Sequence, residues 1–275
     1  MGKLGRRAVI AGAAVAAAGI GTWLYHRVQA GTYACFDTMF GKARVYQVED
    51  DSGRPVRLLE VGGTVHSGTY MDEELRYDLV FEYLKRYDAM FDLAAAGLEG
   101  WPAHEVRRVL VLGCGGYDYP EHLLAHHPEV TVDGVEIDPA ITDIAQRYFW
   151  LDRCIEEFDA EETGRLHIFT ADARILLEEA AARGITWDAI VNDLYDAGEP
   201  VLSLATHEAA QYIYACLEPG GFYLTNIVSA LEGPNSAFLR QQTAIMRDVF
   251  AETAVLACDP DTLTDPDNVI LIAHS

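Results

Sequence analysis

Three polar groups follow three apolar segments of the chain and have the chemistry to bind a nucleotide. The first is the glycine turn Gly113-Cys114-Gly115-Gly116, which can present backbone N–H groups to a ligand at the start of a helix. Glu136 ends the next apolar segment, about twenty residues later, where a carboxylate can accept hydrogen bonds from both ribose hydroxyls. Asp172 follows the third segment. Gly113, Gly115, Gly116, Glu136 and Asp172 therefore predict a site for an adenosine-type ligand.

The turn reads Gly-Cys-Gly-Gly-Tyr-Asp rather than G-x-G-x-x-G. It lacks the spacing that places a pyrophosphate at the N-terminus of a helix, and this argues against NAD. No His or Asp is placed by the sequence to activate Cys114, so we interpret this cysteine as a small packing residue.

The elements that must position these residues are strands and helices in alternation. From Val106 onward, apolar runs such as VRRVLVLG and VTVDGVEI alternate with amphipathic segments such as PAITDIAQRYFW. This alternation predicts a mainly parallel sheet with helices on both faces, followed by two closing strands. The region 43–65 alternates around turn signals and predicts antiparallel hairpins, and 71–97 predicts a helix. We therefore divide the chain into 43–95, a hairpin domain with its connecting helix, and 104–275, the domain that binds the ligand.

The composition limits the classes of ligand and macromolecule that the protein is expected to bind. A formal net charge of −23 repels phosphate backbones, so we expect no nucleic-acid binding, whereas a small cationic substrate is electrostatically favoured. The five cysteines form no CxxC pair, which argues against a zinc site or a disulfide framework. His122 and His126 have the i, i+4 spacing of metal ligands, yet no third ligand is apparent, and we predict no metal.

Residues 1–30 predict a signal or anchor segment. A basic start precedes an uncharged stretch from Ala8 to Tyr25, close to the ~20 residues of a membrane-spanning helix. Arg6-Arg7 is similar to a twin-arginine export signal, with a cleavage site at Ala30. A hydrophobic helix that anchors the chain in a membrane is equally compatible, and the side of the membrane stays open.

Four later segments carry a resemblance to a known family. LGCGGYDYPEHLL, GVEIDPAITDIAQRYF, FTADARILLEE and WDAIVNDLYDA resemble the corresponding segments of the spermidine synthase family, a branch of the class I S-adenosylmethionine-dependent transferases. SGTYMDEELRYDLVFEYL is similar to the segment that precedes the sheet domain in that family. The resemblance covers roughly Val45 to Ile272, and HSGTYMDEE is similar to a divergent branch in which such domains follow a membrane segment.

The resemblance implies an α/β fold with a Rossmann-like class I methyltransferase-type sheet, a small N-terminal antiparallel β domain and often a homodimer. The family moves an aminopropyl group from decarboxylated S-adenosylmethionine to an amine and leaves methylthioadenosine.

Matched to the family's motifs, Glu136 is expected to hold the ribose, and Asp172 with Ala173 to face the adenine. Asp193 and Asp196 are the catalytic candidates. An amine attacks a carbon next to a sulfonium only as its free base, so a carboxylate must take or hold the proton. We assign that role to Asp193. The expected amine-binding residues are Asp196, Asp72, Tyr195 and His66.

Two departures from the family keep other functions open. Gly116 stands where the family has an aspartate that binds the donor's amine, and Asp118 is a candidate substitute two places later. Arg76-Tyr77-Asp78 replaces the family's Tyr-His-Glu. The first alternative is therefore an S-adenosylmethionine-dependent methyltransferase, and the second is a non-catalytic binder of nucleosides or polyamines.

Overall fold

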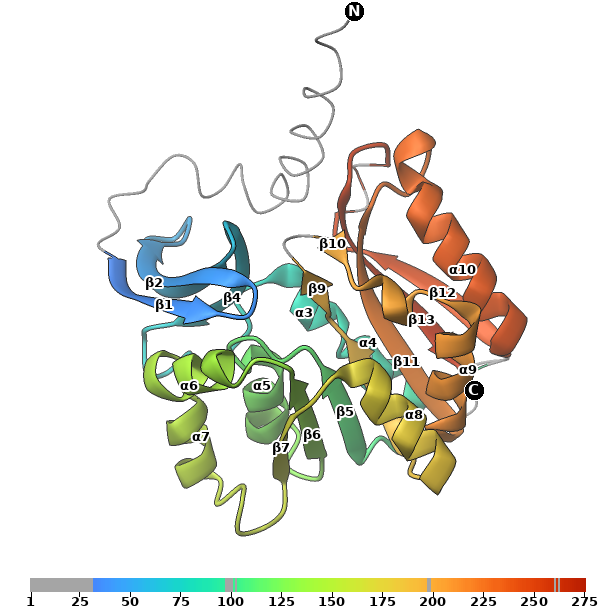
Figure 1. The fold of residues 1–275 in the computed structure, drawn as a ribbon, viewed down its shortest axis with the longest axis horizontal. Coiled ribbons are helices and arrows are strands. Elements are labelled where there is room, and N and C mark those ends of the chain that lie inside the picture. Colours follow the sequence, from blue (N-terminus) through green and yellow to red (C-terminus); the bar gives the residue numbers. More distant parts are fainter. Residues whose placement is uncertain (1–31, 97–100, 102, 197–198, 260, 262) are drawn as a thin grey trace, which may run out of the picture.

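The computed structural model describes residues 32–96, 101, 103–196, 199–259, 261 and 263–275 (Figure 1). The predicted segment 1–30, with its hydrophobic helix, lies outside these residues. Within the part of the chain that the structure describes, no helix is both long enough and apolar enough to cross a membrane.

A small antiparallel sheet comes first. Its strand order is β1-β2-β3-β4, with each strand paired to its neighbour in sequence. It begins before the predicted start at Ala43. The strands are β1 (Thr32–Thr38), β2 (Gly41–Glu49), β3 (Pro55–Val61) and β4 (Thr64–Tyr70). The prediction of a small N-terminal antiparallel sheet is confirmed.

The segment after β4 differs from the single helix predicted for 71–97. Helix begins only at Glu82 and is divided into α3 (Glu82–Arg86) and α4 (Ala89–Ala96). Before it, Tyr77 and Leu79 are buried at a spacing of two, and Leu79 forms a bridge with Thr69 of β4. Residues 71–81 form turns with this single bridge to β4, so the predicted helix is confirmed only from Glu82 onward.

A seven-stranded mixed sheet forms the rest of the chain, in the order β12-β13-β11-β8-β5-β6-β7. Five strands are parallel, and β13 runs antiparallel to both β11 and β12. The strands are β5 (Arg108–Leu112), β6 (Thr131–Glu136), β7 (Leu166–Thr170), β8 (Trp187–Asn192), β11 (Leu217–Ser229), β12 (Glu252–Ala257) and β13 (Asp267–His274). A short hairpin, β9 (Tyr195–Asp196) with β10 (Glu199–Pro200), follows β8.

Helices cover both faces of this sheet. Alternate residues of β5 point to opposite faces and pack against different helices. Val109 and Val111 pack in one core with α3, α4, α5 and α7, whereas Leu110 and Leu112 pack in a second core with α8, α9 and α10. The helix bounds are α5 (Asp118–His126), α6 (Pro139–Tyr148), α7 (Leu151–Glu157), α8 (Ala173–Arg183), α9 (His207–Ala215) and α10 (Ala237–Val249), with single turns η1 (Leu202–Leu204) and η2 (Pro234–Ser236).

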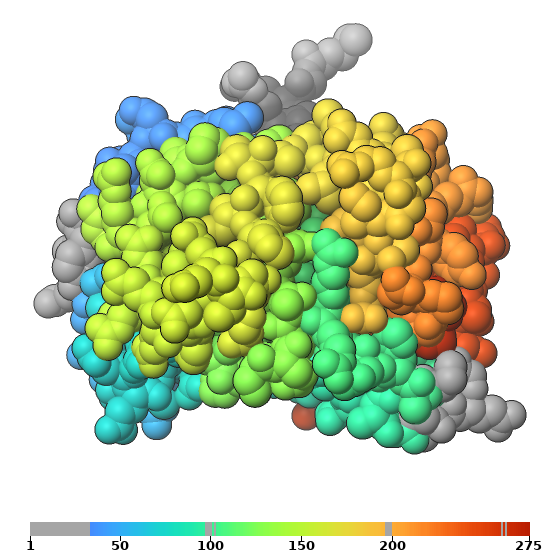
Figure 2. All heavy atoms as spheres, turned by 90° about the horizontal axis from the view of Figure 1, so that it is seen from below, coloured from blue at the N-terminus to red at the C-terminus, as the bar shows by residue number. Residues whose placement is uncertain are grey.

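The small sheet packs on the large one through α6. Ile141, Ile144 and Phe149 form a separate core with Ala43, Val45, Leu59 and Val61 of the small sheet. Seen from below, the blue and cyan segments of the small sheet lie at one side of the molecule and the red C-terminal segments at the other (Figure 2). This packing brings β4 over the carboxyl ends of the parallel strands, the edge at which ligands bind in such sheets.

Candidate active site

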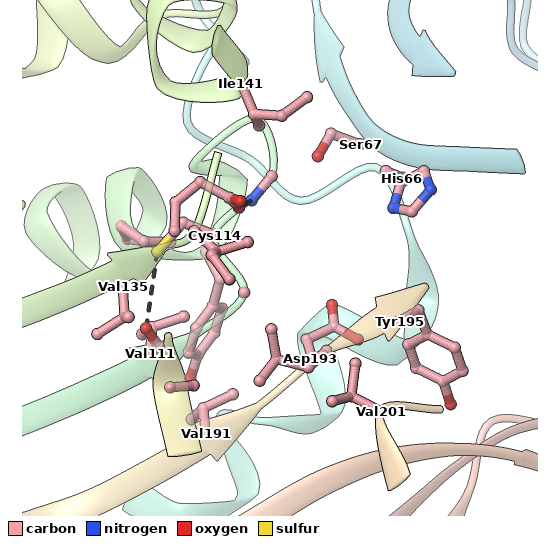
Figure 3. Close-up of a pocket in the computed structure, with 18 of the residues that line it drawn as sticks. His66, Ser67, Val111, Cys114, Val135, Ile141, Val191, Asp193, Tyr195 and Val201 are labelled. Carbon is pink, nitrogen blue, oxygen red and sulfur yellow. Dashed lines mark hydrogen bonds between the residues drawn. The ribbon is translucent and has the colours of Figure 1, made fainter. Parts of the chain in front are cut away.

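A cavity lies between β4 and the carboxyl ends of β5, β6 and β8 (Figure 3). Eight of the residues predicted for the site line it: His66, Gly113, Gly115, Glu136, Asp172, Ala173, Asp193 and Tyr195. Gly116 and Asp72 are not among its lining residues. Asp196 lies in β9, and its side chain is outside the described part of the chain.

The glycine turn is held against the small sheet. The Gly116 amide donates to Ser67 Oγ at 2.7 Å. A Cβ at Gly116 would meet Ser67 Cβ at 2.8 Å and Phe149 Cδ1 at 3.0 Å, so no side chain fits there without displacing β4 or α6. Gly113 and Gly115 have φ of +83° and +51°, which favour glycine. The departure at Gly116 is therefore a packing requirement, because β4 occupies the space that an aspartate would need.

Glu136, at the end of β6, is fixed to the same turn. Its Oε2 accepts from the Gly115 amide at 3.1 Å, and its Oε1 accepts from the Asp138 amide at 3.1 Å. Burial raises the pKa of its carboxyl, and the backbone donors partly oppose that rise. The carboxylate is thus held at the cavity wall in one orientation, where it can accept from ribose hydroxyls.

Asp172 caps a helix, in addition to its predicted place beside the adenine. It is the N-cap of α8, and its Oδ1 accepts from the amides of Arg174 at 2.8 Å and Ile175 at 3.2 Å. Ala173 is the first residue of the helix. Both residues line the cavity, and the cap fixes the Asp172 carboxyl at the carboxyl end of β7.

Asp193 follows β8 and is held from two sides. Tyr83 of α3 donates to its Oδ2 at 3.0 Å, and Asn226 of β11 donates to its Oδ1 at 3.0 Å. Burial raises the pKa of Asp193 to about 6, although the hydrogen bonds from Asn226 and Tyr83 favour the ionised form. The carboxylate is therefore mostly ionised at neutral pH and basic enough to accept a proton.

Asp118 brings a second buried carboxyl to the cavity. It is the first residue of α5, and its Oδ2 accepts from the Gly68 amide of β4 at 3.0 Å. Burial raises its pKa to about 7, against the effect of the Gly68 amide and the Ser67 hydroxyl, and the charge of Asp193 adds to the rise. Each negative charge makes ionisation of the other carboxyl less favourable. A cation bound between Asp118 and Asp193 would therefore stabilise the ionised form of both.

The remaining candidates occupy different places. The hydroxyl of Tyr195 donates to the Asn226 carbonyl and accepts from the Val228 amide, both at 3.0 Å, so it ties β9 to β11. His66 lies on β4 above the cavity (Figure 3). Asp72 is exposed in the loop after β4. Arg76, whose cation could have repelled an amine, pairs instead with both carboxylate oxygens of Glu157 at 2.7 Å.

Cys114 fits the packing interpretation. Its thiol donates to the Val111 carbonyl at 3.6 Å, the dashed line in Figure 3, and burial raises its pKa well above the ordinary value for a thiol. Reactive cysteines have a lowered pKa.

Sequence reasoning missed Tyr83, Tyr87, Asn226 and Ser67. The one available signal was the pair of tyrosines four residues apart in FEYLKRYD.

Comparison with known proteins gives relatives of two kinds. No family model matches the chain. It is 31% identical over 160 residues to a polyamine aminopropyltransferase of Vibrio vulnificus, which covers 58% of this chain and 48% of that protein. It is 28% identical over 134 residues to a probable polyamine aminopropyl transferase of Bifidobacterium longum, covering 49% and 27%. An eEF1A lysine and N-terminal methyltransferase of Homo sapiens is 26% identical over 130 residues, covering 44% and 17%. The chain thus spans about half the length of these relatives or less.

Solved structures have the same fold. A probable spermidine synthase from Corynebacterium glutamicum superposes with a TM-score of 0.67 at 21% identity, covering 88% of this chain and 79% of that one. A spermidine synthase bound to the transition state analogue AdoDATO gives 0.62 at 15%, covering 88% and 73%. Human methyltransferase-like protein 13 bound to SAH gives 0.54 at 21%, covering 70% and 82%. The predicted α/β class I methyltransferase-like fold is confirmed for the described residues.

Proposed function

We propose that this chain is a spermidine synthase-like transferase that moves an aminopropyl group from decarboxylated S-adenosylmethionine to an amine. The observation that carries the proposal is the pair of carboxyls, Asp118 and Asp193, that face one cavity beside a glycine turn and Glu136. Both substrates are cationic, and two buried acidic groups favour the binding of cations.

The reaction assigns a role to each group. The amine nitrogen attacks the carbon next to the donor's sulfonium, a C–N bond forms, and the C–S bond breaks with its electron pair passing to sulfur. The products are methylthioadenosine and an alkylated ammonium, which loses its proton. Asp193 accepts a hydrogen bond from the attacking amine and receives that proton, since its pKa of about 6 leaves it ionised at neutral pH. Glu136 binds the ribose, Asp172 and Ala173 lie beside the adenine, and Asp118 binds the donor's own amine.

The relatives support aminopropyl transfer as the reaction. Two of those described above are named as aminopropyltransferases, and the AdoDATO complex superposes over 88% of this chain.

The test is product analysis with the purified chain. We expect methylthioadenosine from decarboxylated S-adenosylmethionine and a panel of diamines and polyamines, with kcat reduced about 100-fold to 10,000-fold in Asp193→Asn and donor binding retained. Asp51→Asn, in the exposed turn after β2, is the matched control and should leave kcat unchanged. Full kcat in Asp193→Asn would refute the role of Asp193.

Methyl transfer is the second candidate, and one observation favours it. The contact between Ser67 and Gly116 excludes a side chain there, and Asp118, with a pKa of about 7, is only partly ionised at neutral pH. The attraction for the free amine of the decarboxylated donor is weakened accordingly. S-adenosylhomocysteine as the product would establish this function. Binding of both donors with no product from any acceptor would favour the non-catalytic binder.

We also propose that residues 1–30 attach the chain to a membrane or export it, and that the domain forms a homodimer. The basic start and uncharged stretch support attachment. Fractionation of cells that express the full chain, compared with a chain that begins near Thr32, tests the first proposal. Sedimentation of the shorter chain tests the second.

A further inference from the structure

Three side chains with metal-binding chemistry gather beside α5, and none of the three is among the residues that line the cavity. They are Asp88, between α3 and α4, His122 on α5, and His127 directly after it. One ligand atom of each lies within 4.8 Å of the others. The sequence offered the pair His122 and His126, with no third ligand. In the structure His127, rather than His126, lies beside His122, and Asp88, 34 residues before His122 in the chain, is the third candidate ligand.

The hydrogen bonds of His122 point to a cation at this place. Its Nδ1 lies 3.2 Å from the Tyr77 carbonyl, which only accepts, so Nδ1 carries a proton. Its Nε2 lies 2.9 Å from Asp88 Oδ2, which is also an acceptor. In a neutral imidazole the lone pair of Nε2 would then face a carboxylate oxygen. A metal ion bound between Nε2 and Oδ2 removes that repulsion.

Neighbouring groups orient all three ligands as the outer shell of a metal site does. The Tyr77 carbonyl fixes the tautomer of His122, and Tyr119 donates to Asp88 Oδ1 at 3.0 Å. The ring of Phe91 stacks on His127 at 3.8 Å between centroids and 10° between planes. Histidine ligands in metal sites commonly donate their other N–H to a carbonyl, and ligating carboxylates are themselves hydrogen-bonded.

We propose that Asp88, His122 and His127 bind a divalent transition metal, with Zn²⁺ as the fitting ion. Two imidazole nitrogens and one carboxylate oxygen suit zinc and leave a fourth tetrahedral position for water. Magnesium and calcium are disfavoured because they prefer oxygen ligands.

A metal ion at this site would stabilise one wall of the cavity. Asp88 directly follows Tyr87, which lines the cavity, and Tyr119 both lines the cavity and donates to Asp88. A metal ion joining Asp88 to α5 therefore holds two tyrosines of the cavity wall in place. The proposal does not depend on which group the protein transfers, since it concerns binding of the ion alone.

The experiment is a Zn²⁺ titration of the full chain after removal of any affinity tag, against a chromophoric chelator. It uses a Cys35→Ser background, since Cys35 is an exposed thiol. We expect one Zn²⁺ per chain, with Kd raised in His127→Gln by more than the about 100-fold that loss of an outer-shell partner costs. His207→Gln, on an exposed residue of α9, is the matched control and should bind as the parent does.

Two results would overturn the proposal: no binding at up to about 100 µM Zn²⁺, or equal binding in the parent and His127→Gln. The first would leave the His122–Asp88 contact as a hydrogen bond that only supports the fold. If His127→Gln does not fold, Asp88→Asn, which keeps the size of the side chain, decides by the same criterion. Titration with Co²⁺ gives an independent measurement, because a tetrahedral site produces visible absorption that must be lost in the same variants.

Discussion

Removal of the Tyr83 hydroxyl should make Asp193 a stronger base and lower the rate of methylthioadenosine formation at neutral pH. In Tyr83→Phe the carboxylate loses the 3.0 Å hydrogen bond that favours its ionised form. A hydrogen bond to a charged group contributes about 1.5–3 kcal/mol, and one pKa unit corresponds to about 1.4 kcal/mol. The pKa should therefore rise from about 6 by about 1–2 units. At about pH 7 the ionised fraction then falls from about nine tenths to between about a half and a tenth.

The assay is the pH dependence of kcat/KM for methylthioadenosine formation. Its acid limb reports the free protein's essential base, so the midpoint should move up by about 1–2 units in Tyr83→Phe, with activity recovering above it. Tyr46→Phe, on β2 and outside the cavity lining, is the control and should leave the limb in place. An acid limb that stays where it is in Tyr83→Phe would refute the assignment of Asp193 as the titrating base.

Three further changes test the cavity. Glu136→Ala removes the ribose acceptor and should weaken donor binding about 10-fold to 100-fold by calorimetry; unchanged affinity would contradict that role. Gly116→Ala places a Cβ at 2.8 Å from Ser67 Cβ and should lower the free energy of unfolding in urea by about 1–3 kcal/mol. Because the pKa of Asp118 is raised from 3.8 to about 7, its contribution to stability is present below about pH 4 and lost as pH rises through about 7. Asp118→Asn should therefore be more stable than the parent above that range, and a constant difference at all pH values would contradict the raised pKa.

The sheet was predictable because parallel strands buried on both faces read as continuous apolar runs. VLVL of β5 places two residues in each of the two cores, and such a run between helical patterns has few other solutions. The prediction of a single helix after β4 was wrong for residues 71–81. Leu75, Leu79 and Phe81 fit a loose helical spacing, but the backbone there forms turns, and Leu79 forms a bridge with Thr69 of β4.

The position of the site could be predicted from one rule, but the contacts within it could not. Glu136 is the last residue of a parallel strand, and Gly113 and Asp193 directly follow two others, so we could expect them to meet at one edge of the sheet. Tyr83 and Asn226, which hold Asp193, come from 110 and 33 residues away in the chain. No spacing pattern announces such contacts, since they arise from how α3 and β11 pack. Asp88 escaped the search for a third metal ligand for the same reason.

The attachment of the glycine turn to β4 has a consequence for the architecture. Ser67 accepts from Gly116, and the next amide, Gly68, donates to Asp118. Two adjacent residues of the small sheet thus complete the hydrogen bonding of the loop that begins α5. A chain that begins after residue 70 would leave the Gly116 amide and the Asp118 carboxyl without these partners. The small sheet is therefore an integral wall of the binding site, and exchange of this sheet between related proteins would transplant part of the donor pocket along with it.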